Sequence, residues 1–234
     1  MVLKTDHAEE VLNVLSFFKE LNPKDINSSV ATVLGQDICN RKCDPYVFVE
    51  IYNEKIRNFR DVVVYFEDEY TNERIRNNAI AVSDKLSMFF DLKVLNRKWS
   101  DHVNAFVTHE SEIKIESVSP GLKRVIPILV LEDEIQDIKS KIDQVLFDSI
   151  KESSLPLFVK SSILLGMKRL NLLVELQNVF GVSSFVDVMY SLYKDMRMYE
   201  TVYPDASKGL WVDVKEAIVK YAQTVKKMND GIDD

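Results

Sequence analysis

The spacing of apolar residues changes twice along the chain, and each change marks a boundary between predicted elements. At the start, apolar residues recur every three or four positions, the period of an amphipathic helix: Ala8, Val11, Leu15 and Phe18. Asn22-Pro23 ends this helix, and a second is predicted through Val30, Val33 and Ile38. From about residue 46 the spacing shortens to two, and β-branched and aromatic residues become frequent.

Six segments in the middle of the chain have this short spacing, which predicts strands: 46–52, 61–67, 86–95, 102–109, 111–118 and 123–131. Segment 86–95 alternates apolar and polar residues, which is typical of a sheet with one face in water. The connections are too short for repeated parallel crossovers, so we expect an antiparallel sheet. Pro127 places the last strand at an edge or at a bulge.

Helical spacing returns after residue 131 and continues to the end of the chain. Segment 155–180 is apolar nearly all round, which predicts a central helix buried on every side, with the last helix packed onto it. The sequence therefore predicts an α+β fold with two N-terminal helices, a central antiparallel sheet of about six strands and a C-terminal helical half of about four helices. We expect two domains, 1–131 and 132–234, packed as one unit.

Composition limits the chemistry that the chain supports. It has 6 glycines in 234 residues, well below the average of about 7%. Because glycine builds the tight loops that hold phosphates, and neither the dinucleotide-binding nor the P-loop glycine motif is present, we expect no nucleotide-loop ligand and no cofactor. The net charge of −7 argues against non-specific nucleic-acid binding. The last third is neutral, so an RNA-binding structural protein stays as an alternative.

The sequence also predicts where the protein resides. No signal-peptide pattern opens the chain, and the longest apolar run, Val125–Leu131, is far too short to span a bilayer. Cys39 and Cys43 are four residues apart, which is a poor spacing for a structural disulfide, and zinc would need two more ligands. We therefore expect two reduced thiols in a soluble cytoplasmic protein, with no metal and no membrane contact.

Three acids, Glu132, Asp133 and Glu134, follow the apolar run PILVL. The stretch resembles the first strand of a response-regulator receiver domain, which implies a Mg²⁺-binding acidic pair within a βα repeat. The residues after Ile135 have helical spacing instead, so the resemblance stops at these few residues. The first turn of a helix, where acids meet unpaired N–H groups, accounts for the triplet. The same letters recur at 67–69, and a divalent ion would need the two triplets to meet.

The stretch DHVNAFVTHESEIK, residues 101–114, holds the spacing Asp101…Glu112-x-Lys114. It resembles the D…ExK pattern of PD-(D/E)xK nucleases, which implies two carboxylates on Mg²⁺ and a lysine beside the phosphate. In a strand, Glu112 and Lys114 share a face, as that chemistry requires. An amphipathic strand with a charged outer face explains the same letters. A metal-dependent nuclease is therefore the first alternative function.

The segment 188–204 has the most informative pattern for binding. Wound as a helix, it has one inward seam: Phe185, Met189, Leu192, Met196, Tyr199 and Tyr203. Tyr190, Tyr193 and Arg197 fall outside that seam, and tyrosine and arginine are enriched where proteins bind one another. A helix packed from two sides in its own bundle accounts for these residues equally well. We expect a non-enzymatic protein that self-assembles or binds a partner through its helical C-terminal half.

Overall fold

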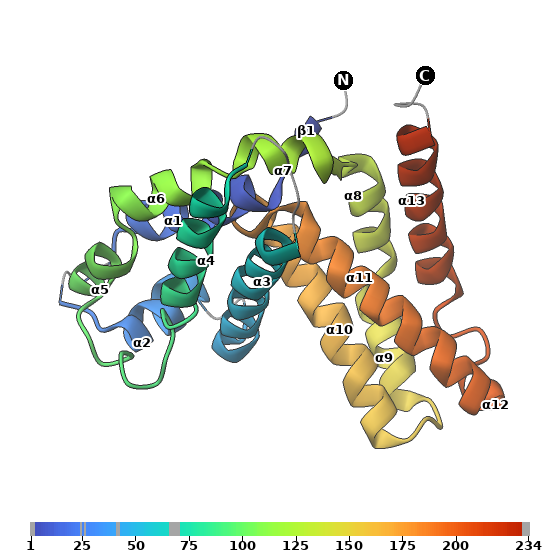
Figure 1. Cartoon of the computed structure of the whole chain (residues 1–234). Helices are drawn as coiled ribbons and strands as arrows, with labels where there is room; N and C mark the ends of the chain where they lie inside the picture. Colours follow the sequence, from blue (N-terminus) through green and yellow to red (C-terminus); the bar gives the residue numbers. More distant parts are fainter. Residues whose placement is uncertain (1–2, 24, 26, 41–42, 66–70, 231–234) are drawn as a thin grey trace. The chain divides into compact units, whose positions relative to one another are not determined.

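The chain is mostly helical, as the computed structural model shows (Figure 1). It describes residues 3–23, 25, 27–40, 43–65 and 71–230, and 77% of the chain is in helices. Within those residues the only sheet pairs two short strands, β1 (Leu3–Thr5) and β2 (Ile128–Val130). The predicted α+β fold with a central six-stranded sheet is therefore wrong.

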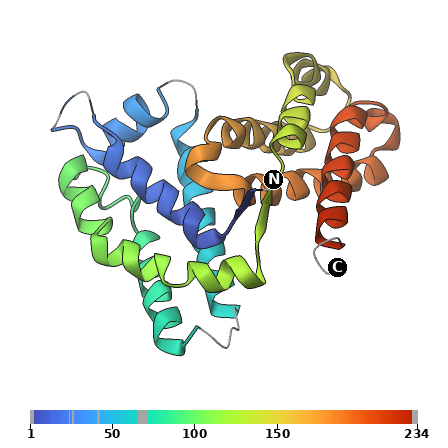
Figure 2. The same ribbon diagram turned by 90° about the horizontal axis from the view of Figure 1, so that it is seen from above.

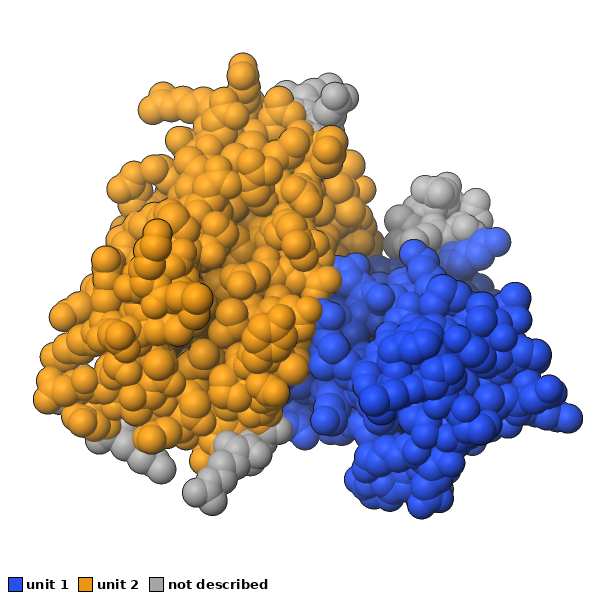
Figure 3. Space-filling model, turned by 90° about the horizontal axis from the view of Figure 1, so that it is seen from below, with its two compact units in different colours: residues 1–3, 129–177, 182–234 blue, residues 4–128, 178–181 orange. Residues whose placement is uncertain are grey.

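Two compact units divide the chain, and Figure 3 colours them separately. The N-terminal unit comprises residues 4–128 and 178–181; the C-terminal unit comprises 1–3, 129–177 and 182–234. The first contains α1 (His7–Glu20), α2 (Val30–Val33), the π-helix η1 (Leu34–Ile38), α3 (Pro45–Tyr65), α4 (Glu73–Leu86), α5 (Trp99–Phe106), α6 (His109–Glu116) and α7 (Ser119–Val125). The C-terminal unit contains α8 (Glu132–Lys141), α9 (Gln144–Glu152), α10 (Leu157–Glu175), most of α11 (Gln177–Val202), α12 (Pro204–Ser207) and α13 (Val212–Asp230). Residues 178–181 of α11 belong to the N-terminal unit.

Helix α3 shows why the strand predictions failed. It covers predicted strand 46–52 and the start of predicted strand 61–67, whose residues 66 and 67 lie outside the described residues. Its buried side chains recur at the helical period along its whole length: Val47, Phe48, Ile51, Tyr52, Lys55, Ile56, Phe59 and Val63. The period continues through 53–60, a segment assigned to a connection, because a window of seven residues is too short to separate the two periods.

The other predicted strands fail for the same reason. Segment 86–95 holds the last residue of α4 and a run of turns, 102–109 falls mostly in α5, and 111–118 falls mostly in α6. Of segment 123–131, only Ile128–Val130 is a strand. These helices are short, so each shows one or two turns of its buried face, and in α5 that face is Trp99, His102, Val103 and Phe106.

The N-terminal unit is built around α1, which packs against α3, α6 and α7 (Figure 1 and Figure 2). Asp6 begins α1 by accepting hydrogen bonds from the backbone N–H groups of Ala8 (2.7 Å) and Glu9 (3.1 Å). Near the other end, the Phe18 ring stacks on Phe89 with ring centroids 4.7 Å apart. This pair lies in an aromatic cluster with Tyr52, Phe90 and Trp99. The cluster anchors the turns of 87–98 to the two long helices.

The C-terminal unit departs from the predicted packing in two places. Helix α13 packs against α8, and Lys220 lies 3.5 Å from Asp137, whereas the sequence predicts that α13 lies on segment 155–180. The helical spacing of 135–150 is divided into α8 and α9, because Asp143 accepts the backbone N–H of Leu146 at 2.8 Å and begins a new helix. An unbroken apolar period therefore does not require an unbroken helix.

We predict that Phe18→Ala destabilises the chain by about 3–5 kcal/mol, because it removes a fully buried ring from the aromatic cluster. Phe17→Ala is a matched control on the same helix, since that ring is only partly buried, and it should cost clearly less. Urea unfolding followed by circular dichroism measures both. Equal losses would show that the cluster is not the core of the unit.

Candidate functional site

The binding residues predicted on segment 188–204 all lie in α11. The predicted inward seam is confirmed in that Phe185, Met189, Leu192, Met196 and Tyr199 are buried, while Tyr203 is partly exposed. Tyr190 is 38% exposed, Tyr193 is partly exposed, and the Arg197 side chain is 63% exposed. Arg197 makes one loose ion pair with Glu200, at 4.0 Å. The proposed binding residues are thus available at the surface.

Helix α10 is not the fully buried helix that its composition predicted. One side packs into the unit through Val159, Ile163, Met167 and Leu170. The other side carries large apolar residues in the open: Leu157 is 80% exposed, Phe158 62% and Leu165 42%. The helix is apolar all round because it has two apolar faces, and the fold covers only one of them.

Helices α10 and α11 are antiparallel neighbours. Phe158 contacts Tyr199 edge to face (6.5 Å between centroids), Ser162 Oγ donates to Asp195 (3.1 Å), and Gly166 lies against Leu192. A side chain at Gly166 would lie 2.9 Å from Leu192 Cδ1, so glycine permits the close approach. Because the two helices run in opposite directions, these three contacts define which side of α10 faces the same way as which side of α11.

Apart from Tyr190, the exposed large apolar residues of both helices lie on one side of this pair. At 100° per residue, Phe158 and Leu165 project from the same flank of α10, and Met198 and Val202 from the matching flank of α11. Met198 is 50% exposed and Val202 58%. We name this surface the α10–α11 face, and it comprises Leu157, Phe158, Leu165, Met198 and Val202.

The residues of the nuclease-like pattern do not have the geometry that suggested the pattern. Asp101 lies in α5, while Glu112 and Lys114 lie two residues apart on α6, where they point to different sides of a helix rather than to one face of a strand. Glu112 binds Lys19 at 2.9 Å, and Lys114 binds Glu110 at 2.6 Å. No cluster of three acidic, histidine or cysteine ligands is found in the described part of the chain.

The acidic triplet that follows the apolar run PILVL lies at the start of a helix. Glu132, Asp133 and Glu134 form the first turn of α8, next to its unpaired N–H groups. The second triplet, 67–69, lies outside the described residues. The location of the first triplet confirms its interpretation as helix-start charge.

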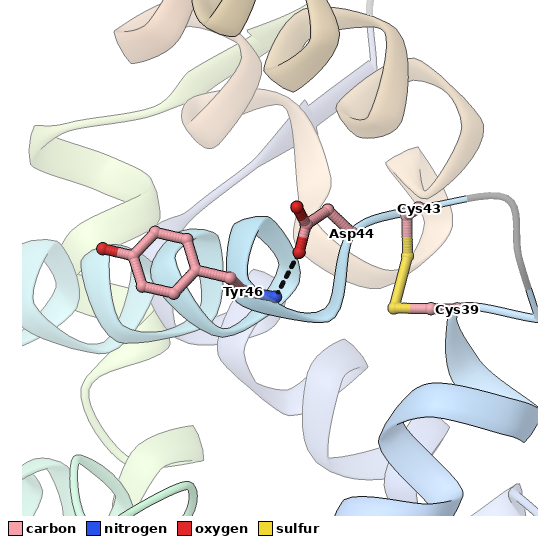
Figure 4. Close-up of a disulfide and its surroundings, with 4 residues drawn as sticks. All are labelled: Cys39, Cys43, Asp44 and Tyr46. Atoms are coloured by element: carbon pink, nitrogen blue, oxygen red, sulfur yellow. Dashed lines mark hydrogen bonds between the residues drawn. A yellow bond between two sulfur atoms is a disulfide. The ribbon is translucent and has the colours of Figure 1, made fainter.

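Cys39 and Cys43 form a disulfide, so the prediction of two reduced thiols is wrong (Figure 4). Their Cα atoms are 4.8 Å apart, which is within the usual span for a disulfide. Asn40 lies between them with φ of 39°, a left-handed conformation that asparagine tolerates. The bond joins the end of η1 to the start of α3, where Asp44 accepts the backbone N–H of Tyr46 at 2.9 Å.

A buried ion pair was missed in the sequence. Lys55 of α3 binds Glu10 of α1, and each side chain is 1% exposed. Gly181 lies against the Glu10 carboxyl with φ of 71° and ψ of −173°, a conformation that only glycine adopts readily and that leaves no room for a Cβ. A signal was present, because Glu10 and Lys55 occupy positions on the apolar stripes of their helices, beside Val14 and Ile51 respectively.

Two titratable groups flank this pair. Burial, and then the charge of Lys55, lower the pKa of His7 from 6.5 to about 4, although Glu10 opposes the shift. Burial raises the pKa of Asp6 despite the 2.6 Å hydrogen bond from Ser119. The Nδ1 atom of His7 is buried without a hydrogen-bond partner, which favours the neutral ring. The hydrogen bond from Ser119 ties the start of α1 to the start of α7.

Comparisons with known proteins do not assign this chain to a family. No protein-family model matches it, and no curated protein and no solved structure matches it. None of the helices in the described residues has both the length and the apolar character to cross a membrane.

We predict that Lys55→Met costs about 3–5 kcal/mol, because it leaves Glu10 buried without its cation. The double change Glu10→Leu with Lys55→Met should recover much of that loss. Lys19→Met removes a partly exposed lysine from its pair with Glu112 and should change the free energy of unfolding by less than about 1 kcal/mol. Urea midpoints of the four proteins test this, and a Lys55→Met protein as stable as Lys19→Met contradicts it.

We predict that the free energy of unfolding falls by about 2 kcal/mol between pH 7 and pH 5 because of His7. Below pH 6.5 the unfolded chain protonates this histidine, while the folded chain does not until about pH 4, so acid favours unfolding. His7→Gln should lose correspondingly less stability over the same range. Urea unfolding of both proteins at both pH values measures the difference between their pH dependences. The contribution of Asp6 is the same in the two proteins and therefore cancels. Identical pH dependence in the two proteins would refute the assignment to His7.

Proposed function

We propose that this chain is a non-enzymatic interaction protein that associates with a second copy or with another protein through the α10–α11 face. The observation that supports it most is the exposure of Leu157 and Phe158 beside Met198 and Val202. Scattered exposed apolar residues are normal on proteins, but large ones gathered on a single side of two packed helices are typical of a binding surface.

The neighbouring residues suit such a surface. Tyr190 and Arg197 lie further round α11, in the positions of a polar rim, and residues of both types are enriched in protein interfaces. Beneath it, Glu200 accepts from Trp211 Nε1 (2.9 Å) and pairs with Lys215 (2.6 Å), which ties α11 to α13. Contacts that hold a helix in place before it binds reduce the conformational entropy that binding costs. We also propose a cytoplasmic location, which rests on the sequence pattern alone, because the Cys39–Cys43 disulfide removes the argument from reduced thiols.

We predict that the chain associates, and that Phe158→Ser with Val202→Ser weakens association at least about tenfold by removing two apolar contacts. Val145→Ser is the control, because Val145 is 72% exposed but lies on α9. A second variant, Tyr190→Ala with Arg197→Ala, tests the rim and should have a smaller effect. Sedimentation velocity over a range of concentrations measures self-association, and affinity purification from the source organism detects other partners.

Two results would contradict the proposal. The first is that the chain without substitutions stays monomeric and purifies with the same bound proteins as the Phe158→Ser/Val202→Ser variant. The second is association that persists in this variant at full strength. All variants should keep the circular dichroism spectrum of the unchanged chain, since the substituted side chains are exposed.

A further inference from the structure

The charge around the α10–α11 face differs from that of the whole chain. The chain has a net charge of −7, yet the exposed side chains bordering the face include Lys168 on α10 and both Lys194 and Arg197 on α11. Lys168 and Lys194 make no ion pair with another described residue, and Arg197 has only its loose contact with Glu200. Glu200 is itself held by Lys215 at 2.6 Å, so its charge is already balanced.

Two exposed acids lie on the same two helices, Glu175 on α10 and Asp187 on α11. Asp187 already has an interaction of its own. Asp195 is partly buried and accepts the hydrogen bond from Ser162. The face therefore combines exposed apolar residues with three exposed cations against two exposed acids, inside a protein that is acidic overall.

The dimensions of the face suit a helix. Along α10 the apolar residues extend from Leu157 to Leu165, about 12 Å at 1.5 Å per residue. This matches the length over which an amphipathic helix presents three anchors at i, i+4 and i+7. Ser161 and Ser191 are small residues on the same side, and they leave room for a backbone to approach.

From these observations we infer that the α10–α11 face binds an acidic amphipathic helix of a partner protein. Its apolar anchors lie on Phe158, Leu165, Met198 and Val202, and its carboxylates face Lys168 and Lys194. The inference rests on the proposed function, since it specifies the partner of that same surface. The lysines contribute selectivity and association rate, while the apolar contacts supply most of the affinity.

The test uses two labelled helical peptides of about five turns with leucine at the same i, i+4 and i+7 positions. One carries glutamate at its remaining polar positions and the other carries lysine. Fluorescence anisotropy against the full chain measures the dissociation constant of each peptide, from about 0.05 to 0.5 M salt. We expect the acidic peptide to bind at least about tenfold more tightly than the basic one, with the preference weakening as salt screens the charges. The net charge of the chain would give the opposite order.

Three variants locate the binding. Lys168→Glu with Lys194→Glu should weaken the acidic peptide at least about tenfold, as should Phe158→Ser with Val202→Ser. Lys226→Glu with Lys227→Glu is the control, because these exposed lysines of α13 give the same change in net charge and should have little effect.

The remaining outcomes separate the inference from the proposed function. Equal or tighter binding of the basic peptide overturns the acidic partner. A second outcome is that neither peptide binds but the chain self-associates, and that Phe158→Ser/Val202→Ser abolishes this association. It also overturns the acidic partner, but it supports the face as an interface between copies of the chain. Binding of neither peptide, together with a monomeric chain that retains no protein through the face, overturns both.

Discussion

The N-terminal unit depends on one interaction, the ion pair between Lys55 of α3 and Glu10 of α1. Both groups are fully withdrawn from water, so each tolerates burial only because the other is present. The pair fixes the position of α1 on α3, and α1 in turn supports α6 and α7. Gly181 closes over the Glu10 carboxyl, and the neutral His7 avoids a second cation beside Lys55.

The sequence predicted the helices at the two ends of the chain better than the middle. In α1 and α11 the apolar period runs over several turns, so the buried residues could be named in advance. In the middle, short helices and many β-branched residues imitate strands over seven-residue windows, and only tertiary packing decides between them. The shortage of glycine was a signal against the sheet, because six antiparallel strands need many tight turns.

The candidate site was partly predictable for a related reason. Tyr190 and Arg197 were found outside the seam of α11, because a helical projection separates covered from exposed positions. The role of α10 was misjudged, since composition shows that a helix has two apolar faces but not which of them the fold covers. The buried pair shows the opposite limit: Glu10 and Lys55 look like surface residues until both stripes are drawn as helices. The nuclease-like spacing lost its geometric basis once Glu112 and Lys114 lay on a helix.

The exposed side of α10 and α11 is the feature that the fold itself does not use. The two helices pack closely through Gly166 and are tied to α13 through Glu200, so they present a firm surface. Native mass spectrometry of the untagged chain, purified from its source in low salt, tests most directly whether that surface binds protein. The account predicts a second polypeptide bound to the chain, lost from the Phe158→Ser/Val202→Ser variant. A bare monomer in both samples, or a complex unchanged by the substitutions, would contradict it.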